Sequence, residues 1–154
     1  MKALLTSACA AFILAQPVFS TASAADPGIH RQQVQFAKGA SSAAIKGRPK
    51  GYEMVDYVVR AGAGQTLTVA LEKTNPQNYF NVLPPGSTDV AMYVGQTGDD
   101  FKGLLPTDGD YTVRVYLMRA AARRNEASDY TLTVGVTGKA LAALPAERLV
   151  SGSS

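Results

Sequence analysis

Two arginines spaced four residues apart are the side chains of this sequence best suited to recognition chemistry. Arg119 and Arg123 stand in the segment 116–125, Tyr-Leu-Met-Arg-Ala-Ala-Ala-Arg-Arg-Asn, which contains no glycine or proline. If the three alanines form a helical turn, both arginines project from the same side of it. Two guanidinium groups held in this way suit an acidic cleft on a partner, because each can bind a carboxylate through charge-assisted hydrogen bonds. A solvated basic loop that only keeps the chain soluble fits the same residues.

Few other side chains are candidates for catalysis or metal binding. The chain has one histidine, His30, and one cysteine, Cys9, so neither a Ser-His-Asp nor a Cys-His arrangement is supported. Clustered zinc ligands and a glycine-rich phosphate loop are also missing. The acidic pairs Asp99-Asp100 and Asp108-Gly109-Asp110 offer oxygen ligands for calcium, but their spacing matches no calcium loop and Asp-Gly is common in turns. The sequence therefore predicts a protein that is not an enzyme and has neither a metal site nor a cofactor.

The arginine segment joins two stretches that alternate like half-buried β-strands. From Asp110 to Tyr116 the residues Tyr111, Val113 and Val115 face one side, and the stretch from Asp129 to Val136 repeats the pattern with four apolar residues. Period-two alternation is typical of strands with one buried face. We therefore expect two strands to hold the arginine segment between them.

Residues 34–105 have the pattern of short strands and turns that is typical of an all-β domain. Short apolar or alternating stretches are separated by turns rich in glycine, proline, asparagine and aspartate. Eight or nine short strands at this spacing predict a single-domain antiparallel β-sandwich of the jelly-roll type. Besides the two strands above, the candidates are 34–36, 43–48, 55–60, 66–71, 79–83, 90–94 and 101–105.

The first 24 residues have the pattern of a cleaved signal peptide. Lys2 supplies a positive start, the stretch from Ala3 to Val18 is largely apolar and uncharged, and Ala22-Ser23-Ala24 offers small residues for cleavage. The apolar stretch is too short, and too interrupted by polar residues and proline, to span a membrane. Since Cys9 lies within this segment, the chain after cleavage would contain no cysteine. The sequence predicts an exported protein of the bacterial periplasm, free of the membrane once the signal is removed.

The remaining chain is long enough for one compact domain. Removing residues 1–24 from the 154 leaves 130, and removing Lys2 lowers the formal net charge from +3 to +2. This mild charge, without any tryptophan, is not the basic excess of a nucleic-acid binder. We expect an N-terminal arm at 25–33, the β-sandwich at 34–138, and a C-terminal tail at 139–154 that begins with one or two helical turns.

Several short motifs occur in order between residues 36 and 136. Phe36 to Ala43 runs Phe-Ala-Lys-Gly-Ala-Ser-Ser-Ala, Lys50-Gly51-Tyr52 follows, and Arg119 to Asn125 contains Arg-Ala-Ala-Ala-Arg-Arg-Asn. Together these motifs resemble the periplasmic inhibitors of goose-type (g-type) lysozyme. The segment 78–105 departs from the family pattern, with its own Asn-Val-Leu-Pro-Pro-Gly-Ser run.

The resemblance implies a function and a set of contact residues. In the family, a β-sandwich presents a loop that enters the lysozyme cleft. The contacts come from a tyrosine after Lys-Gly and two arginines, which are Tyr52, Arg119 and Arg123 in this sequence. Arg124 and Asn125 would support the loop, Asn125 by hydrogen-bonding nearby backbone. The implied protein is a non-enzymatic inhibitor that protects peptidoglycan from a host or competitor g-type lysozyme by blocking its active site.

Other classes of protein fit parts of the sequence. Tyr52 could be a half-buried residue at a strand edge, without a binding role. A secreted β-sandwich binding module, of the type appended to secreted peptidases, would hold a glycan or another protein and would be retained on peptidoglycan or chitin without lysozyme. A glycan-acting or nucleic-acid-processing enzyme would show turnover. DNA binding would need a broader basic face than Arg119, Arg123 and Arg124 provide.

Overall fold

The structure is a computed structural model that describes residues 28–141. The predicted signal peptide and most of the predicted tail lie outside these residues. The elements in chain order are β1 (Ile29–Gln33), β2 (Ser42–Gly47), β3 (Met54–Ala61), β4 (Thr66–Lys73), β5 (Asn78–Leu83), β6 (Tyr93–Val94), the short helix η1 (Gly95–Thr97), β7 (Asp100–Leu104), β8 (Gly109–Leu117), α1 (Arg119–Arg123) and β9 (Tyr130–Thr137).

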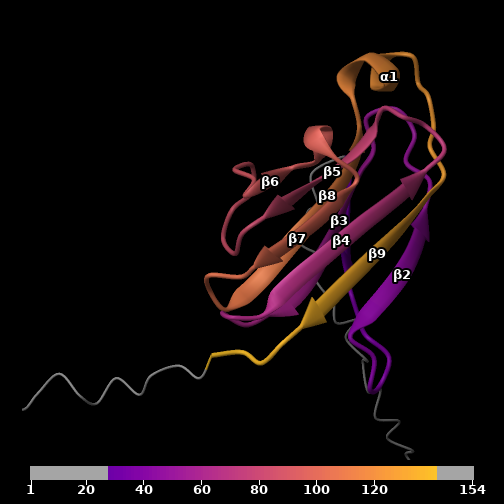
Figure 1. Cartoon of the computed structure of the whole chain (residues 1–154). Helices are drawn as coiled ribbons and strands as arrows, with labels where there is room; N and C mark the ends of the chain where they lie inside the picture. Colours follow the sequence, from indigo (N-terminus) through magenta and orange to yellow (C-terminus); the bar gives the residue numbers. More distant parts are fainter. Residues whose placement is uncertain (1–27, 142–154) are drawn as a thin grey trace, which may run out of the picture.

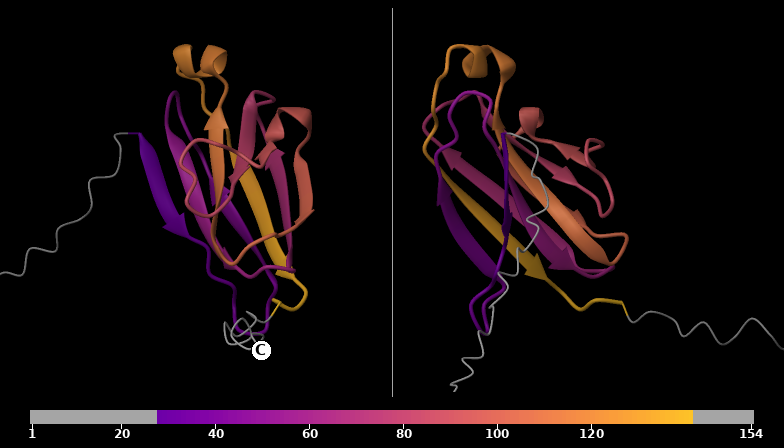
Figure 2. Two further views of the ribbon diagram at one scale, coloured as in Figure 1. Left: turned by 90° about the vertical axis from the view of Figure 1, so that its left-hand side faces the viewer. Right: turned by 180° about the vertical axis from the view of Figure 1, so that it is seen from behind.

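The strands form two sheets that pack face to face, as Figures 1 and 2 show. One sheet has the order β1-β3-β8-β5-β6 and the other β2-β9-β4-β7. If the eight strands after β1 are numbered from one, these orders become 2-7-4-5 and 1-8-3-6, which is the strand order of a jelly roll. All of these eight strands pair antiparallel. The predicted all-β sandwich is confirmed.

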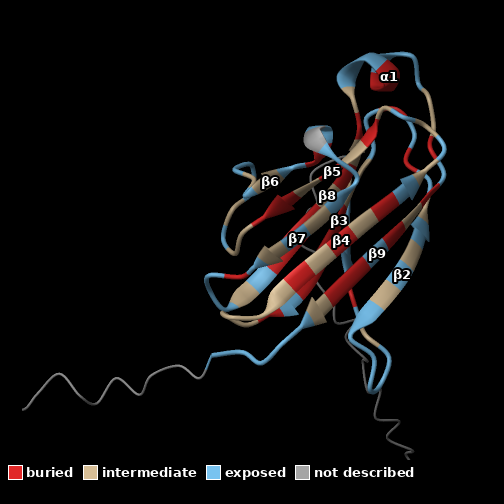
Figure 3. Ribbon diagram, viewed as in Figure 1, coloured by how far each residue is buried: buried red, intermediate tan, exposed pale blue. Residues whose placement is uncertain are grey.

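The strands exist because alternate residues can be buried between the two sheets. In β8, Tyr111, Val113 and Val115 are fully buried, whereas Arg114 and Tyr116, which face the other side, are partly exposed. β4 and β9 alternate in a similar way, as Figure 3 shows. The sequence periodicity therefore identified the inward-facing side chains of these strands.

The N-terminal boundary of the sandwich differs from the expectation. Ile29–Gln33, within the segment predicted as an arm, forms β1 and pairs parallel with β3, so the sheet begins at Ile29 rather than at Val34. His30 lies on this strand opposite Val55 and is exposed. Residues 34–36, predicted as the first strand, are not a strand, although Val34 is buried. An edge strand without a buried face carries no apolar alternation, so its sequence gives no signal.

Two further expectations need correction. The strand predicted for 90–94 is reduced to Tyr93–Val94, because residues 84–92 form an irregular loop instead. Residues 139–141, at the start of the predicted tail, are not helical. The rest of that tail lies beyond the part of the chain that the structure describes.

Candidate partner-binding site

The arginine segment is a short helix that projects from one end of the sandwich. α1 stands between β8 and β9 and extends past the ends of both sheets in Figure 1. Ala121 and Ala122 are buried against the sandwich, while Arg119 and Arg123 are exposed. The helical turn considered from the sequence is therefore present, and its i, i+4 spacing directs both arginines away from the buried alanines.

The C-terminus of α1 is closed by a Schellman motif. Asn125 has φ +55°, the left-handed conformation that commonly ends a helix. Its amide donates to the carbonyl of Ala122 at 2.9 Å, and the amide of Glu126 donates to the carbonyl of Ala121 at 3.1 Å. Within residues 28–141 the Asn125 side chain makes no hydrogen bond. Asn125 thus supports the loop through its backbone conformation rather than through the side-chain hydrogen bond that we expected.

A polar network ties the connection after α1 to the turn between β4 and β5. The Nε of Arg124 donates to one carboxylate oxygen of Glu126 at 2.5 Å, and the Nδ2 of Asn75 donates to the other at 2.8 Å. These hydrogen bonds, first from Asn75 and then from Arg124, lower the pKa of Glu126. Next along the chain, the buried Ser128 hydroxyl accepts from the Asn78 side chain at 3.0 Å. The connection is therefore fixed at several points.

We expected Arg124 to support the loop, but the sequence did not indicate the other residues of this network. Glu126 follows Arg124 closely, but Asn75 and Asn78 lie about fifty residues earlier in the chain. Only the fold brings them together. Polar residues in a turn give no sequence signal that distinguishes an anchor from ordinary turn chemistry.

The turn that carries Tyr52 packs beside this connection. The amide of Gly51 donates to the carbonyl of Glu126 at 2.8 Å, and Lys50 forms an isolated β-bridge with Ala127. Tyr52 follows at once and is 59% exposed, which argues against a half-buried strand-edge role. Segments about seventy residues apart in the sequence thus bring Tyr52 to the same end of the sandwich as α1.

The arginines of α1 differ from most other arginines in having no acidic neighbour. Within the described part of the chain, Arg119 and Arg123 make no hydrogen bond and no ion pair. Their guanidinium groups are therefore available to a carboxylate outside the molecule. Four of the five other arginines in residues 28–141 form ion pairs, which are Arg48–Asp129, Arg60–Asp110, Arg114–Asp56 and Arg124–Glu126.

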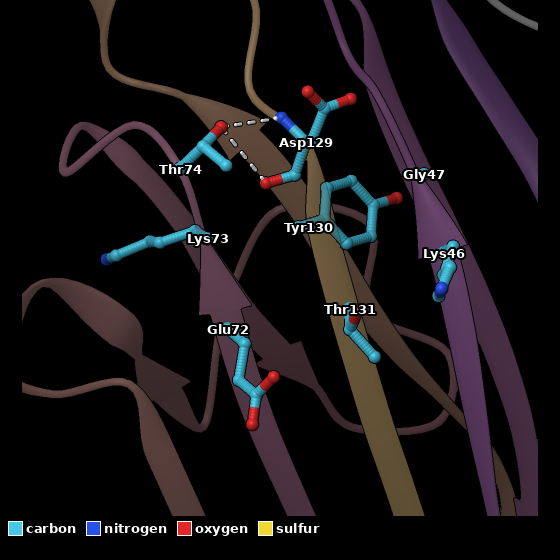
Figure 4. A pocket seen from close by; sticks show the side chains of 8 residues that line it. All are labelled: Lys46, Gly47, Glu72, Lys73, Thr74, Asp129, Tyr130 and Thr131. Atoms are coloured by element: carbon cyan, nitrogen blue, oxygen red, sulfur yellow. Dashed lines mark hydrogen bonds between the residues drawn. The ribbon is translucent and has the colours of Figure 1, made fainter.

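A depression of about 400 Å³ lies beside this end, on the sheet that contains β2, β9 and β4 (Figure 4). Its Lys73 ammonium is paired with Asp99 at 2.5 Å, and its Thr74 hydroxyl accepts from the Asp129 amide at 3.0 Å. The lining residues are Lys46, Gly47, Glu72, Lys73, Thr74, Asp129, Tyr130 and Thr131.

Three of the four acidic residues considered as calcium ligands have other partners. Asp99 binds Lys73, Asp108 accepts a hydrogen bond from the Ala63 amide at 2.6 Å, and Asp110 binds Arg60. Among residues 28–141 no three His, Cys, Asp or Glu side chains are grouped so that they could hold a metal ion. In the same range, no helix has the length and apolar character needed to cross a membrane.

Fold and surface together define a small β-sandwich that presents a rigid basic loop at one end. No family model matches the chain. A curated relative, the inhibitor of g-type lysozyme of Escherichia coli strain K12, is 30% identical over 129 residues, which span 82% of this chain and 93% of the relative. The chain belongs to the family of inhibitors of g-type lysozyme.

Solved structures of the family agree with this assignment. The crystal structure of Aeromonas hydrophila PliG, a periplasmic inhibitor of g-type lysozyme, is 39% identical and has a TM-score of 0.67, covering 71% of this chain and 97% of that one. Salmonella Typhimurium PliG is 27% identical with a TM-score of 0.57, covering 70% and 98%. The resemblance inferred from the motifs is confirmed. Because these relatives are periplasmic inhibitors and not enzymes, the predicted localisation and the non-enzymatic class are confirmed as well.

Proposed function

We propose that this protein inhibits a g-type lysozyme by inserting the α1 end of the sandwich into the enzyme's active-site cleft, and that it thereby protects peptidoglycan. The relatives reported above are inhibitors of g-type lysozyme. The observation that supports the mechanism here is the pair of exposed arginines, Arg119 and Arg123, which lack an acidic partner within the described residues.

The chemistry of a lysozyme cleft complements these side chains. The cleft holds at least one essential carboxyl group, and a guanidinium group can bind a carboxylate through two parallel hydrogen bonds. Inside a cleft both charges lose water, so such a pair contributes more than an exposed one would. Tyr52 adds rigid apolar area beside the arginines at little entropic cost. Occlusion of the cleft excludes the glycan substrate.

The anchoring of the loop supports this role. A loop that must become ordered on binding loses affinity to the entropy of ordering, whereas a fixed loop does not. The Schellman motif, the Asn75–Glu126–Arg124 network and the adjacent Lys50–Gly51 backbone hold α1 before any partner arrives. The arrangement therefore suits a preformed plug.

The experiment that tests the proposal is a titration of lytic activity on cell walls. The purified protein is added to a g-type lysozyme, of host or bacterial competitor origin, with a chicken-type lysozyme in parallel. We expect stoichiometric loss of the g-type activity alone. If neither enzyme loses activity the proposal is wrong, and retention of the protein on peptidoglycan without lysozyme would instead identify a wall-binding module.

A further inference from the structure

The two outer faces of the sandwich differ in chemistry. On the sheet β2-β9-β4-β7, the outward positions of β4 and β9 carry small and hydroxyl side chains, among them Thr68, Ala70, Thr131 and Thr133. On the other sheet, the outward positions next to α1 carry larger apolar and aromatic side chains. A partner that receives α1 therefore meets a different surface on either side of it.

The apolar face begins with a cross-strand row directly below α1. Met54 of β3 pairs with Tyr116 of β8, which pairs with Tyr79 of β5. All three are partly exposed, and the two tyrosine rings lie 6.4 Å apart between centroids. The Tyr116 hydroxyl donates to the Asn81 side chain at 3.2 Å, which fixes the ring on the sheet. The row thus combines a methionine with two tyrosine rings, and the Lys73 ammonium lies 4.6 Å from the centroid of the Tyr79 ring.

A second group of exposed apolar residues continues this face at its edge. Val90, Met92 and Val94 alternate along the chain and are 69%, 38% and 45% exposed. Tyr93 between them faces the core instead and packs at 5.5 Å from Phe80 between ring centroids. Val94 lies opposite the outward-facing Asn81, and Val90 and Met92 precede it in the adjoining loop. We call these three exposed residues the stripe, and they lie in a segment that the family resemblance did not cover.

This stripe runs toward α1. β6 is antiparallel to β5, with Val94 opposite Asn81, so the chain after Val94 approaches the end of the sheet where β5 starts and β8 stops. There η1 follows, and the Gln96 amide donates to the sulfur of Met118, the residue before α1, at 3.5 Å. In Figure 1, η1 lies between β6 and α1. The apolar face and the α1 end thus form one continuous surface.

The loop before the stripe is held in place by a buried ion pair. Arg114 donates to both carboxylate oxygens of Asp56 at 2.7 and 2.8 Å, and a further nitrogen of Arg114 donates to the Thr88 carbonyl at 3.0 Å. The Asp56 side chain is only 6% exposed. Val90 therefore lies in a segment that is held by hydrogen bonds, although its own side chain is exposed to solvent.

We propose that this face, comprising the row Met54–Tyr116–Tyr79 and the stripe Val90–Met92–Val94, is a second contact surface for the same lysozyme, against an apolar wall beside the cleft that α1 enters. The inference rests on the proposed function. A standard interface involves about 20–30 residues on each partner, whereas α1 and Tyr52 together supply six. The hydroxyl-rich face opposite offers no comparable apolar area, so the lysozyme lies on the β6 side of α1.

The test compares three stripe substitutions with a matched change on the other sheet. The variant Val90→Ser/Met92→Ser/Val94→Ser removes the exposed apolar area. The control Leu104→Ser changes a side chain that is 69% exposed on β7, at the outer side of the hydroxyl-rich sheet. Binding to g-type lysozyme and thermal unfolding are measured for both, and the single variant Val90→Ser is included because it changes only a loop position.

We expect the triple variant to bind roughly ten- to a hundredfold more weakly, Val90→Ser a few-fold more weakly, and Leu104→Ser as tightly as the unmodified protein. The salt dependence of the Kd should not change, because no charge is removed. Unaltered binding by a folded triple variant would overturn the inference alone, whereas failure of the unmodified protein to inhibit would overturn the proposed function as well. If the triple variant changes self-association instead of lysozyme binding, the occupant is a second copy and the inference is wrong.

Discussion

The arginines of α1 occupy an electrostatic setting that a stability argument does not explain. Exposed ion pairs contribute little to folding, typically under about 1 kcal/mol, so even the paired Arg48 and Arg60 add little. Arg119 and Arg123 have no such pair within residues 28–141, and their removal should leave the fold unchanged. Any large effect of removing them must therefore appear in binding.

We predict that Arg119→Ala and Arg123→Ala each weaken inhibition of g-type lysozyme strongly. Truncation of a buried interface arginine costs about 2–4 kcal/mol, which corresponds to roughly 30- to 1,000-fold in affinity. We expect Tyr52→Ala to weaken inhibition in the same way, because the Tyr52 ring would fill apolar space beside the arginines. The inhibition constant and the midpoint of thermal unfolding are measured together for each variant.

The matched control for this prediction is Arg60→Ala. Arg60 is exposed and lies near the opposite end of β3 from Met54, where it pairs with Asp110 at 3.3 Å. Its removal changes the net charge by the same amount and should alter inhibition less than about threefold, since only long-range attraction is reduced. Equal losses for Arg60→Ala and Arg123→Ala would mean that net charge, and not the α1 site, determines binding.

The orientation of helix α1 depends on the backbone conformation of the residue at its C-terminal end. Asn125 stands in the left-handed region, where asparagine and glycine are tolerated and other residues are strained by about 1 kcal/mol. The neighbouring turn adds a constraint, because a Cβ on Gly51, itself at φ +61°, would lie 2.8 Å from the Asn125 side-chain oxygen. The two segments that carry Arg123 and Tyr52 are thus fitted to each other.

We predict that Asn125→Ala weakens inhibition by about three- to tenfold, while Asn125→Gly retains it. Alanine keeps the side chain small but cannot adopt a positive φ without strain, so the Schellman motif opens and α1 loses its orientation. Glycine adopts the conformation freely. Hydrogen exchange of the Glu126 amide, which donates to Ala121, reports the motif directly. Similar behaviour of the two variants would assign Asn125 a side-chain role instead.

The anchor at Glu126 makes the loop sensitive to acid. Hydrogen bonds from Asn75 and then Arg124 hold the pKa of Glu126 below its ordinary value, so the folded protein prefers the charged carboxylate. This contribution to stability is complete above the unfolded pKa of about 4.3 and is lost as the pH falls through the lower folded pKa. We predict that Glu126→Gln lowers the Tm at pH 6 and that the difference from the unmodified protein shrinks toward pH 3. A difference independent of pH would contradict an ionic anchor.

Local features of the site were predictable from sequence, and non-local ones were not. The i, i+4 arginines and the alternating strands on either side are encoded within a few residues, so periodicity revealed them. The Asn75–Glu126 hydrogen bond joins positions 51 residues apart, and only the strand order creates it. Similarly, β1 reads Ile-His-Arg-Gln-Gln and is a strand because β3 offers it an open edge, not because of its own pattern.

At the scale of the whole molecule, the two sheets are joined by a buried polar contact as well as by apolar packing. The hydroxyl groups of Tyr57 on β3 and Tyr130 on β9 lie 2.5 Å apart, with their rings edge to face at 6.5 Å between centroids. Burial raises the pKa of Tyr130, with help from the Tyr57 hydroxyl, and burial raises the pKa of Tyr57 as well. Both groups therefore remain protonated donors and acceptors until the pH exceeds the ordinary tyrosine pKa of about 10.

This contact leads to a double-mutant prediction that separates stability from inhibition. Tyr130→Phe leaves the buried Tyr57 hydroxyl without its partner, and we expect a loss of about 1–2 kcal/mol in the free energy of unfolding. Tyr57→Phe should cost about the same. Tyr57→Phe/Tyr130→Phe leaves no unpaired hydroxyl, so it should be less destabilised than the sum of the two single changes. Urea unfolding measures the cycle, and additive losses would show that the hydroxyl groups do not interact. Because both tyrosine rings are buried between the sheets, we expect none of these three variants to change inhibition of lysozyme, provided that the variant is folded at the assay temperature. Arg123→Ala should show the opposite pattern, with full stability and weak inhibition, if the fold serves to position α1.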